Sequence, residues 1–98
     1  MKKLDKREKV LLAGRWGKTH ALAKAIVKNP MNRLYSFMDK PNVGIKKIAE
    51  DYRLGDLGNP HEILDYAREK DVDFVVIVPH FALEKGAADL LNKNQIPF

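Results

Sequence analysis

Residues 9–20 read Lys-Val-Leu-Leu-Ala-Gly-Arg-Trp-Gly-Lys-Thr-His, and this stretch decides the fold. Its apolar run, which ends at Ala13, is typical of a strand buried on both faces of a sheet. After the glycine turn, apolar residues recur at helical spacing from Thr19 until Asn29-Pro30 ends the pattern. A buried strand that leads through a glycine turn into a helix predicts the first unit of a parallel α/β sheet.

The same alternation of strands and helices continues along the chain. Runs rich in β-branched and aromatic residues predict strands, and apolar residues at helical spacing predict helices. Residues 73–78 form the run with the strongest strand signal, so we expect this strand at the centre of the sheet. The other expected elements are strands at 33–38 and 52–54 and helices at 45–52, 60–70 and 82–92.

The helix that starts at residue 60 has the clearest local signal. Asn59 stands at the N-cap, Pro60 at the first helical position and Glu62 three residues after the cap, which is a capping-box pattern. Strands and helices that alternate with short connections require a parallel sheet with right-handed crossovers. We therefore predict a single-domain, Rossmann-like α/β fold with four to five parallel strands in the order 3-2-1-4(-5) and helices on both faces.

Length and composition limit the function classes. The 98 residues suit one domain, 1–98, with 1–8 as a charged N-terminal extension. No apolar run approaches the roughly 18 residues of a membrane span, so we expect a cytoplasmic protein and no membrane partner. The absence of cysteine excludes disulfides, thiolate zinc sites and a cysteine nucleophile.

The net charge of +5 is unevenly distributed. Residues 1–47 hold 13 Lys and Arg against 3 Asp and Glu, whereas residues 48–98 hold 5 against 10. A basic half favours a phosphate-bearing partner, namely nucleic acid, a nucleotide or a sugar phosphate. A solvated lysine-rich surface explains the same composition. The aromatic residues do not alternate with the basic ones, so a stacking platform for single strands is not indicated.

The predicted strand order places a site between the first and fourth strands, at their carboxyl ends. Glycines in the first loop allow close backbone approach, and the N-terminus of the following helix favours an anion. Turn geometry for the glycines and loop capping for the histidines are the alternatives. The predicted sugar-phosphate or phosphate-binding residues of the two loops are Gly14, Arg15, Gly17, Lys18, His20, Pro79 and His80.

Other ligand motifs fail on individual residues. Gly17-Lys18-Thr19 is similar to the end of a Walker A loop, but Leu12 stands where that motif needs its first glycine. Trp16 interrupts a dinucleotide fingerprint. No metal site is predicted, because two histidines without a patterned carboxylate do not complete a coordination shell.

Nearly the whole chain resembles the N-terminal domain of phosphoribosylamine-glycine ligase, also called glycinamide ribonucleotide synthetase. The family opens with a strand and a Gly-x-Gly-Gly-Arg-Glu-His-Ala loop, and residues 10–21 are similar to it. Residues 34–38 and 42–45 resemble the family's second strand and Asn-Pro-Gly segment. The remaining similar segments are 49–52, 55–57 and 75–79 with Ala82-Leu83.

The resemblance implies a pre-ATP-grasp domain of a purine-biosynthesis ligase, which helps to bind phosphoribosylamine. In the full family enzyme an ATP-grasp unit uses ATP and Mg²⁺ to activate glycine; this domain alone would bind no cofactor and catalyse nothing. Four positions depart from the family pattern: Trp16 and Val78 replace glycines, and Thr19 and His80 replace glutamates.

Two alternatives stay open. A solitary relative would serve as a phosphate- or nucleic-acid-binding module or as a protein-interaction module. Apolar residues near Ile96 and Phe98 would then serve a homodimer or a separately encoded ATP-grasp subunit.

Overall fold

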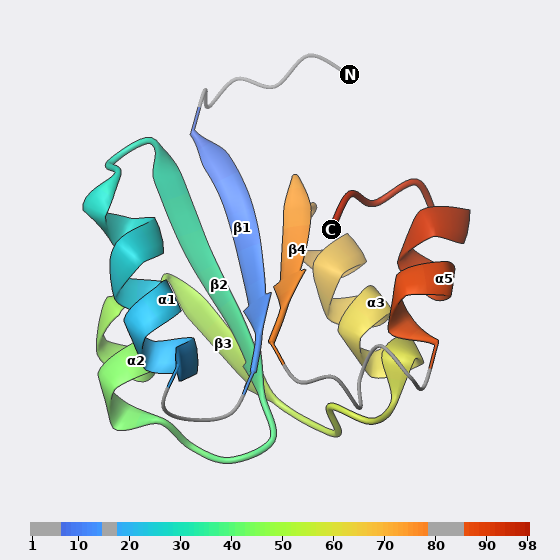
Figure 1. Ribbon diagram of the computed structural model, residues 1–98, viewed down its shortest axis with the longest axis horizontal. Coiled ribbons are helices and arrows are strands. Elements are labelled where there is room, and N and C mark those ends of the chain that lie inside the picture. The colour runs from blue at the N-terminus through green and yellow to red at the C-terminus, as the bar shows by residue number, and fades with distance from the viewer. Residues whose placement is uncertain (1–6, 15–17, 79–85) are drawn as a thin grey trace.

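The computed structural model describes residues 7–14, 18–78 and 86–98, and these form one parallel sheet covered by helices (Figure 1). The hydrogen-bonded strand order is β3-β2-β1-β4, which confirms the predicted arrangement. All three strand pairs are parallel. The strands are β1 (Glu8–Ala13), β2 (Asn32–Met38), β3 (Asp51–Leu54) and β4 (Phe74–Ile77).

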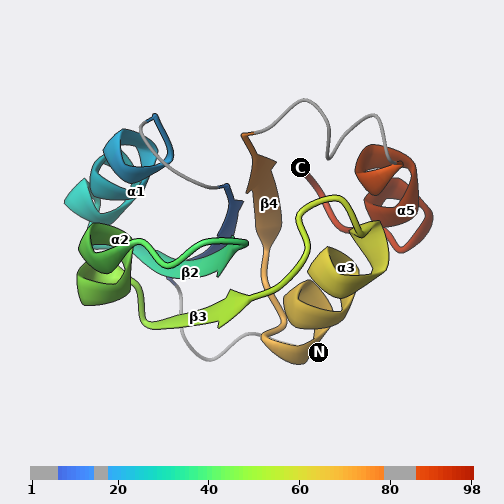
Figure 2. The same ribbon diagram turned by 90° about the horizontal axis from the view of Figure 1, so that it is seen from below.

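The described helices cover both faces of the sheet (Figure 2). On one face lie α1 (Lys18–Lys28) and α2 (Val43–Ile48), and on the other α3 (Pro60–Glu69) and α5 (Ala87–Lys93). This is the two-sided covering that right-handed crossovers produce in a doubly wound sheet. No described helix has the length and apolar character needed to cross a membrane.

Alternate residues of β1, β2 and β4 pack into two separate cores. Leu11 and Ala13 of β1 face α3 and α5, where they pack with Phe37 and Val75. Leu12 faces the other way and packs with Ala23 of α1 and Ile45 of α2. Both faces of β1 are therefore buried, which explains the continuous apolar run that identified this strand.

The expectation of a central strand at residues 73–78 is wrong. β4 lies at one end of the sheet, and only Val75 within it is fully buried. The Val75 N–H donates to Pro97 O at 2.8 Å, so residues of the C-terminal segment cover the outer edge of β4 in place of a further strand. This covering lets an end strand carry the apolar sequence of an interior one.

The predicted helix at 45–52 ends earlier than expected. α2 stops at Ile48, and Ala49 is already extended, with φ −81° and ψ 143°. The Glu50 N–H donates to Leu34 O at 2.8 Å, which starts the pairing of β3 with β2. Tyr52 therefore lies in β3 and is exposed, because the sheet ladder competes with helix continuation for the same backbone groups.

Both helices on the α3/α5 face end with the same hydrogen-bonded motif. Asp71 and Gln95 adopt left-handed φ values of 53° and 59°. The next residues, Val72 and Ile96, donate backbone N–H groups to carbonyls five residues earlier, at 3.1 Å and 2.9 Å. This is the Schellman arrangement, and it turns both apolar side chains back onto the core.

The start of α3 follows the sequence signal in part. The Asn59 side chain accepts from the His61 N–H at 3.1 Å, which confirms the N-cap. Glu62, however, accepts from the Asp56 N–H at 3.3 Å. The Asn59 N–H, which a capping box would supply to Glu62, donates to Asp56 O instead. At the other end of the chain, α5 begins only after Gly86, and residues 82–85 of the expected helix lie outside the described residues.

Candidate functional site

The chain leaves β1 and β4 at adjacent points on the carboxyl edge of the sheet. Ala13 is paired with Ile77, and Ala13 O accepts the N–H of Val78 at 3.0 Å. On the other side of β1, the Gly14 N–H donates to Phe37 O at 3.0 Å. This edge is at the bottom of Figure 1, where α1 also begins. The two predicted ligand loops therefore start next to each other, as the strand order required.

Gly14 is needed at the first bend because a buried side chain occupies the place of its missing Cβ. A Cβ built there would lie 2.5 Å from Thr19 Oγ1 and 2.6 Å from Thr19 Cγ2, both closer than non-bonded atoms approach. Thr19 is 1% exposed, in the first turn of α1. The glycine therefore allows the hydroxyl of Thr19 to lie directly against the backbone of the turn.

The Thr19 hydroxyl has an unusual environment. Within the part of the chain that the structure describes, Oγ1 is buried and has no hydrogen-bond partner. A buried hydroxyl without a partner costs on the order of 1–3 kcal/mol. A hydroxyl at a helix N-terminus can donate to an anion that also accepts from backbone N–H groups of the first helical turn.

His20 packs between the two helices of its face. A Cβ on Gly44, in the first turn of α2, would collide with Cε1 and Nε2 of the His20 ring. The ring edge that carries Nε2 therefore faces α2, and the side chain is half-buried. This contact connects the N-terminal turns of α1 and α2, which both start at the carboxyl edge of the sheet, and no sequence pattern indicated it.

The structure places only part of the predicted binding set. Gly14 and His20 are described, and Lys18 begins α1. The other four predicted residues, Arg15, Gly17, Pro79 and His80, lie outside the described residues, as does the Lys18 side chain. Their role at the site stays a prediction.

An open hollow lies on the same edge of the sheet, on the α3/α5 side. It has a volume of about 580 Å³, and residues at the start of α3 and along α5 line it. Its polar lining comes from exposed side chains. The lining residues are Pro60, His61, Gly86, Asp89, Leu90, Asn92 and Lys93.

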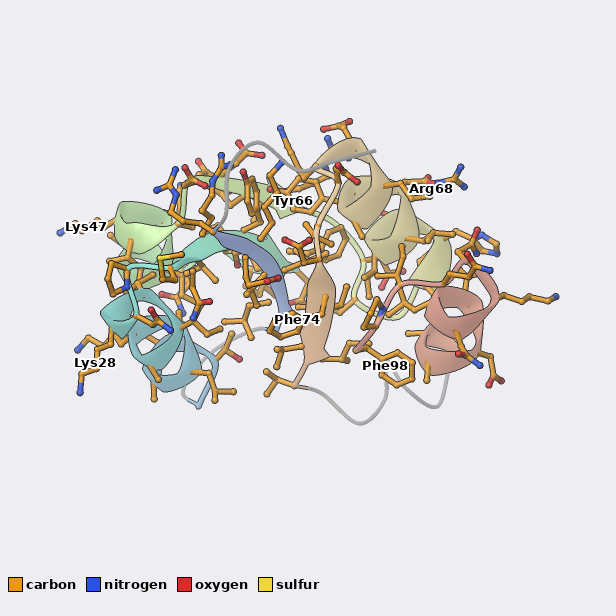
Figure 3. The ribbon with its side chains drawn as sticks, turned by 90° about the horizontal axis from the view of Figure 1, so that it is seen from above. Lys28, Lys47, Tyr66, Arg68, Phe74 and Phe98 are labelled. Atoms are coloured by element: carbon orange, nitrogen blue, oxygen red, sulfur yellow. The ribbon has the colours of Figure 1, made fainter. Side chains whose placement is uncertain are left out.

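A buried tyrosine, Tyr66 (labelled in Figure 3), and a carboxylate form a polar cluster that the sequence patterns did not indicate. The Tyr66 hydroxyl donates to Asp51 Oδ2 at 2.7 Å, and Lys70 Nζ lies 3.3 Å from the same oxygen. The guanidinium of Arg53 stacks over the Tyr66 ring, 4.7 Å from its centroid, and pairs with Glu69 at 2.6 Å. The cluster joins β3 to α3 and lies away from the carboxyl edge of β1 and β4.

The pKa values of this cluster follow from burial and hydrogen bonding. Burial raises the pKa of Tyr66 far above its usual range, and the neighbouring Asp51 carboxylate adds to the shift. The hydrogen bond from Tyr66 holds the pKa of Asp51 below its usual value. Tyr66 is therefore a neutral donor to a charged acceptor at neutral pH, which suits a structural role better than proton transfer.

Comparison with known proteins identifies the family. The family model for the N domain of phosphoribosylglycinamide synthetase matches residues 8–98. The chain belongs to this family. Phosphoribosylamine-glycine ligase from Methanopyrus kandleri is 40% identical over 91 residues, and the enzyme of the same name from Pyrococcus furiosus is 36% identical over 89. Each match covers 91% of this chain and 20% of the relative, so the chain spans about a fifth of these ligases.

Solved structures confirm the fold at low sequence identity. A Mycobacterium tuberculosis protein described as glycinamide-RNase-transformylase T superposes with a TM-score of 0.67 at 17% identity, over 87% of this chain and 24% of its own. The ADP complex of an N5-carboxyaminoimidazole ribonucleotide synthetase gives 0.66 at 12% identity, over 93% and 23%. A dTDP-glucose 4,6-dehydratase from Bacillus anthracis, in complex with NAD, also gives 0.66, at 15% identity over 89% and 34%. Enzymes of several classes therefore share this fold, and at these identities the matches show the fold alone.

Proposed function

We propose that this chain is the N-terminal, substrate-binding domain of a phosphoribosylamine-glycine ligase, and that it binds the phosphate of phosphoribosylamine at the turn between β1 and α1. Family membership supports the ligase assignment. The unpartnered, buried Thr19 hydroxyl beside Gly14 is the observation that supports this position for the phosphate.

The chemistry of the turn explains how such a ligand would be held. Phosphate oxygens accept from backbone N–H groups at the start of α1, where the helix dipole also favours negative charge. The Thr19 hydroxyl rotates to donate to one of these oxygens and so gains the partner it lacks. Arg15 and Lys18 are the predicted counter-charges. The domain thus binds and orients the sugar phosphate and holds no cofactor.

In this proposal, an ATP-grasp unit catalyses the ligation. That unit would lie either elsewhere in the same polypeptide or in a separate subunit. That unit would bind ATP and Mg²⁺ and activate glycine for attack by the amine of phosphoribosylamine. The cytoplasm is the compartment that fits this role.

Calorimetric titration with ribose 5-phosphate and with glycinamide ribonucleotide tests the binding site. We expect saturable binding that is lost in Lys18→Ala and in Arg15→Ala. In Thr19→Val, which keeps the shape and removes the hydroxyl, binding should weaken by about 10-fold or more, since hydrogen bonds to charged groups contribute roughly 1.5–3 kcal/mol.

Ser36→Ala is the matched control. Ser36 is the other buried hydroxyl without a partner in the described chain, and it lies in the middle of β2. Removal of the Ser36 hydroxyl should leave the affinity for both ligands unchanged. Absence of heat at millimolar ligand, or equal affinity of Thr19→Val and the parent, would refute the assignment of this turn.

A further inference from the structure

The layer formed by α1 and α2 carries only positive charge. The two helices contain five lysines and no Asp or Glu. On the opposite face of the sheet, α3 and α5 together hold four carboxylates and two basic residues. We call the four of these lysines whose side chains the structure describes the lysine layer: Lys24, Lys28, Lys46 and Lys47.

Lysines of this layer have no carboxylate partners among the described residues. Lys24, Lys28 and Lys47 are exposed and form no ion pair there, and Lys46 Nζ lies over the Tyr52 ring at 4.9 Å. In contrast, cations near β3 are neutralised: Arg33 pairs with Glu50 at 2.6 Å. Arg53 and Lys70 likewise pair with Glu69 and Asp51. Lys24, Lys28 and Lys47 are therefore exposed cations without a carboxylate partner in the part of the chain that the structure describes.

The two helices that carry the lysine layer are packed on a common core. Ala23 of α1 and Ile45 of α2 are buried in the same core, so the helices that carry the lysines are held together. Lys24 and Lys28 are one helical turn apart, about 6 Å along the axis. In Figure 3, Lys28 and Lys47 project from the same outer side of the molecule, away from the sheet.

We propose that the lysine layer binds the phosphate backbone of a nucleic-acid duplex without recognising bases. Several cations on two neighbouring helices that carry no carboxylates match a polymer that presents negative charge at regular intervals. Neither helix carries Phe, Tyr or Trp, so among the described residues the two helices themselves offer no ring on which the bases of a single strand would stack. This function is separate from sugar-phosphate binding, because Lys24 and Lys28 lie in the second half of α1, away from the turn at Gly14.

Salt-dependent binding tests the proposal. Fluorescence anisotropy with a labelled random-sequence DNA duplex and its RNA counterpart gives the dependence of log K on log salt. For duplexes each phosphate contact contributes about 0.9 to the slope, so Lys24→Gln/Lys28→Gln should reduce its magnitude by about 1.8. From roughly 50 to 200 mM salt the parent should therefore lose about 12-fold more affinity than this variant.

Arg68→Gln/Lys93→Gln provides the matched control. Both residues are exposed on the opposite helices, and the change removes the same net charge. We expect its slope to equal that of the parent. The proposal is overturned if neither duplex binds, if the two double variants lose slope equally, or if poly-glutamate displaces duplex at equal charge concentration more effectively than unlabelled duplex does. The last result would indicate an acidic protein partner.

Discussion

Substitution Tyr66→Phe measures how strongly the Tyr66–Asp51 hydrogen bond ties α3 to the edge strand β3. The hydroxyl donates to Asp51 Oδ2 at 2.7 Å, while the ring is fully buried and lies 6.3 Å from the ring of Phe37. Phenylalanine keeps the ring and its packing. The change therefore removes a single donor and leaves the core volume almost unaltered.

The expected loss follows from the surroundings of Asp51. A hydrogen bond to a charged group contributes roughly 1.5–3 kcal/mol. Asp51 is half-buried and keeps Lys70 Nζ at 3.3 Å, so its carboxylate is not left alone. We expect the lower end, about 1.5 kcal/mol of unfolding free energy. For a domain of this size that corresponds to a fall in Tm of about 6–12 °C.

The pKa shifts of Asp51 and Tyr66 predict how the cost of Tyr66→Phe depends on pH. Because Tyr66 holds the pKa of Asp51 below its usual value, this stabilisation is complete above about pH 4 and is lost as pH falls through the folded-state pKa. The raised pKa of Tyr66 acts at the other end, where stability is lost as pH rises above about 10. The cost of Tyr66→Phe should be constant between these limits and shrink outside them.

Urea denaturation at neutral and acidic pH is the assay. The control is Tyr52→Phe. Tyr52 follows Asp51 in β3 and its ring is exposed, so we expect the unfolding free energy to change by no more than about 0.5 kcal/mol. In an Asp51→Asn background the effect of Tyr66→Phe should be smaller. An equal cost in both backgrounds would show that the hydroxyl does not act through the carboxylate, and the reasoning would be refuted.

Three further predictions concern stability and are measured by the same denaturation. Gln95→Gly should stabilise by about 0.5–1 kcal/mol, because glycine adopts the φ of 59° without strain; destabilisation would contradict the Schellman assignment. Ser36→Ala should stabilise the protein by about 1 kcal/mol, since the Ser36 hydroxyl is buried without a partner among the described residues. A loss of stability would show that this hydroxyl does form a hydrogen bond in the folded protein. Gly44→Ala should destabilise by about 1–3 kcal/mol through the His20 ring. In a His20→Ala background the same change should stabilise by up to about 1 kcal/mol, and equal effects in both would exclude the contact.

Local sequence signals predicted the parts of the fold that depend on neighbouring residues. The Asn59 cap was correct because a cap acts within one helical turn. The strand order was correct because alternating elements with short connections leave few topologies. The position of β4 was not, because an apolar run reports burial on both sides and does not say what covers the edge.

The candidate site shows the same limit. The sequence pointed to Gly14 and His20 through the glycine turn and the start of the helix. It did not indicate that His20 packs on Gly44, since that contact depends on how α1 and α2 meet. Ser36 would be taken for an outward-facing residue of an apolar strand, but helices cover both faces of β2, and its hydroxyl is buried.

The sequence by itself therefore determined most element types, the strand order, the family and the edge of the sheet at which the two predicted ligand loops start, because each rests on local pattern or on chain connectivity. Three features depended on the tertiary structure. They are the Tyr66–Asp51 hydrogen bond, the close approach of the Thr19 side chain to Gly14, and the lysines of α1 and α2 that lie without carboxylate partners among the described residues. These features join groups from different elements, and their partners are set by the packing of helices on the sheet rather than by distance along the chain.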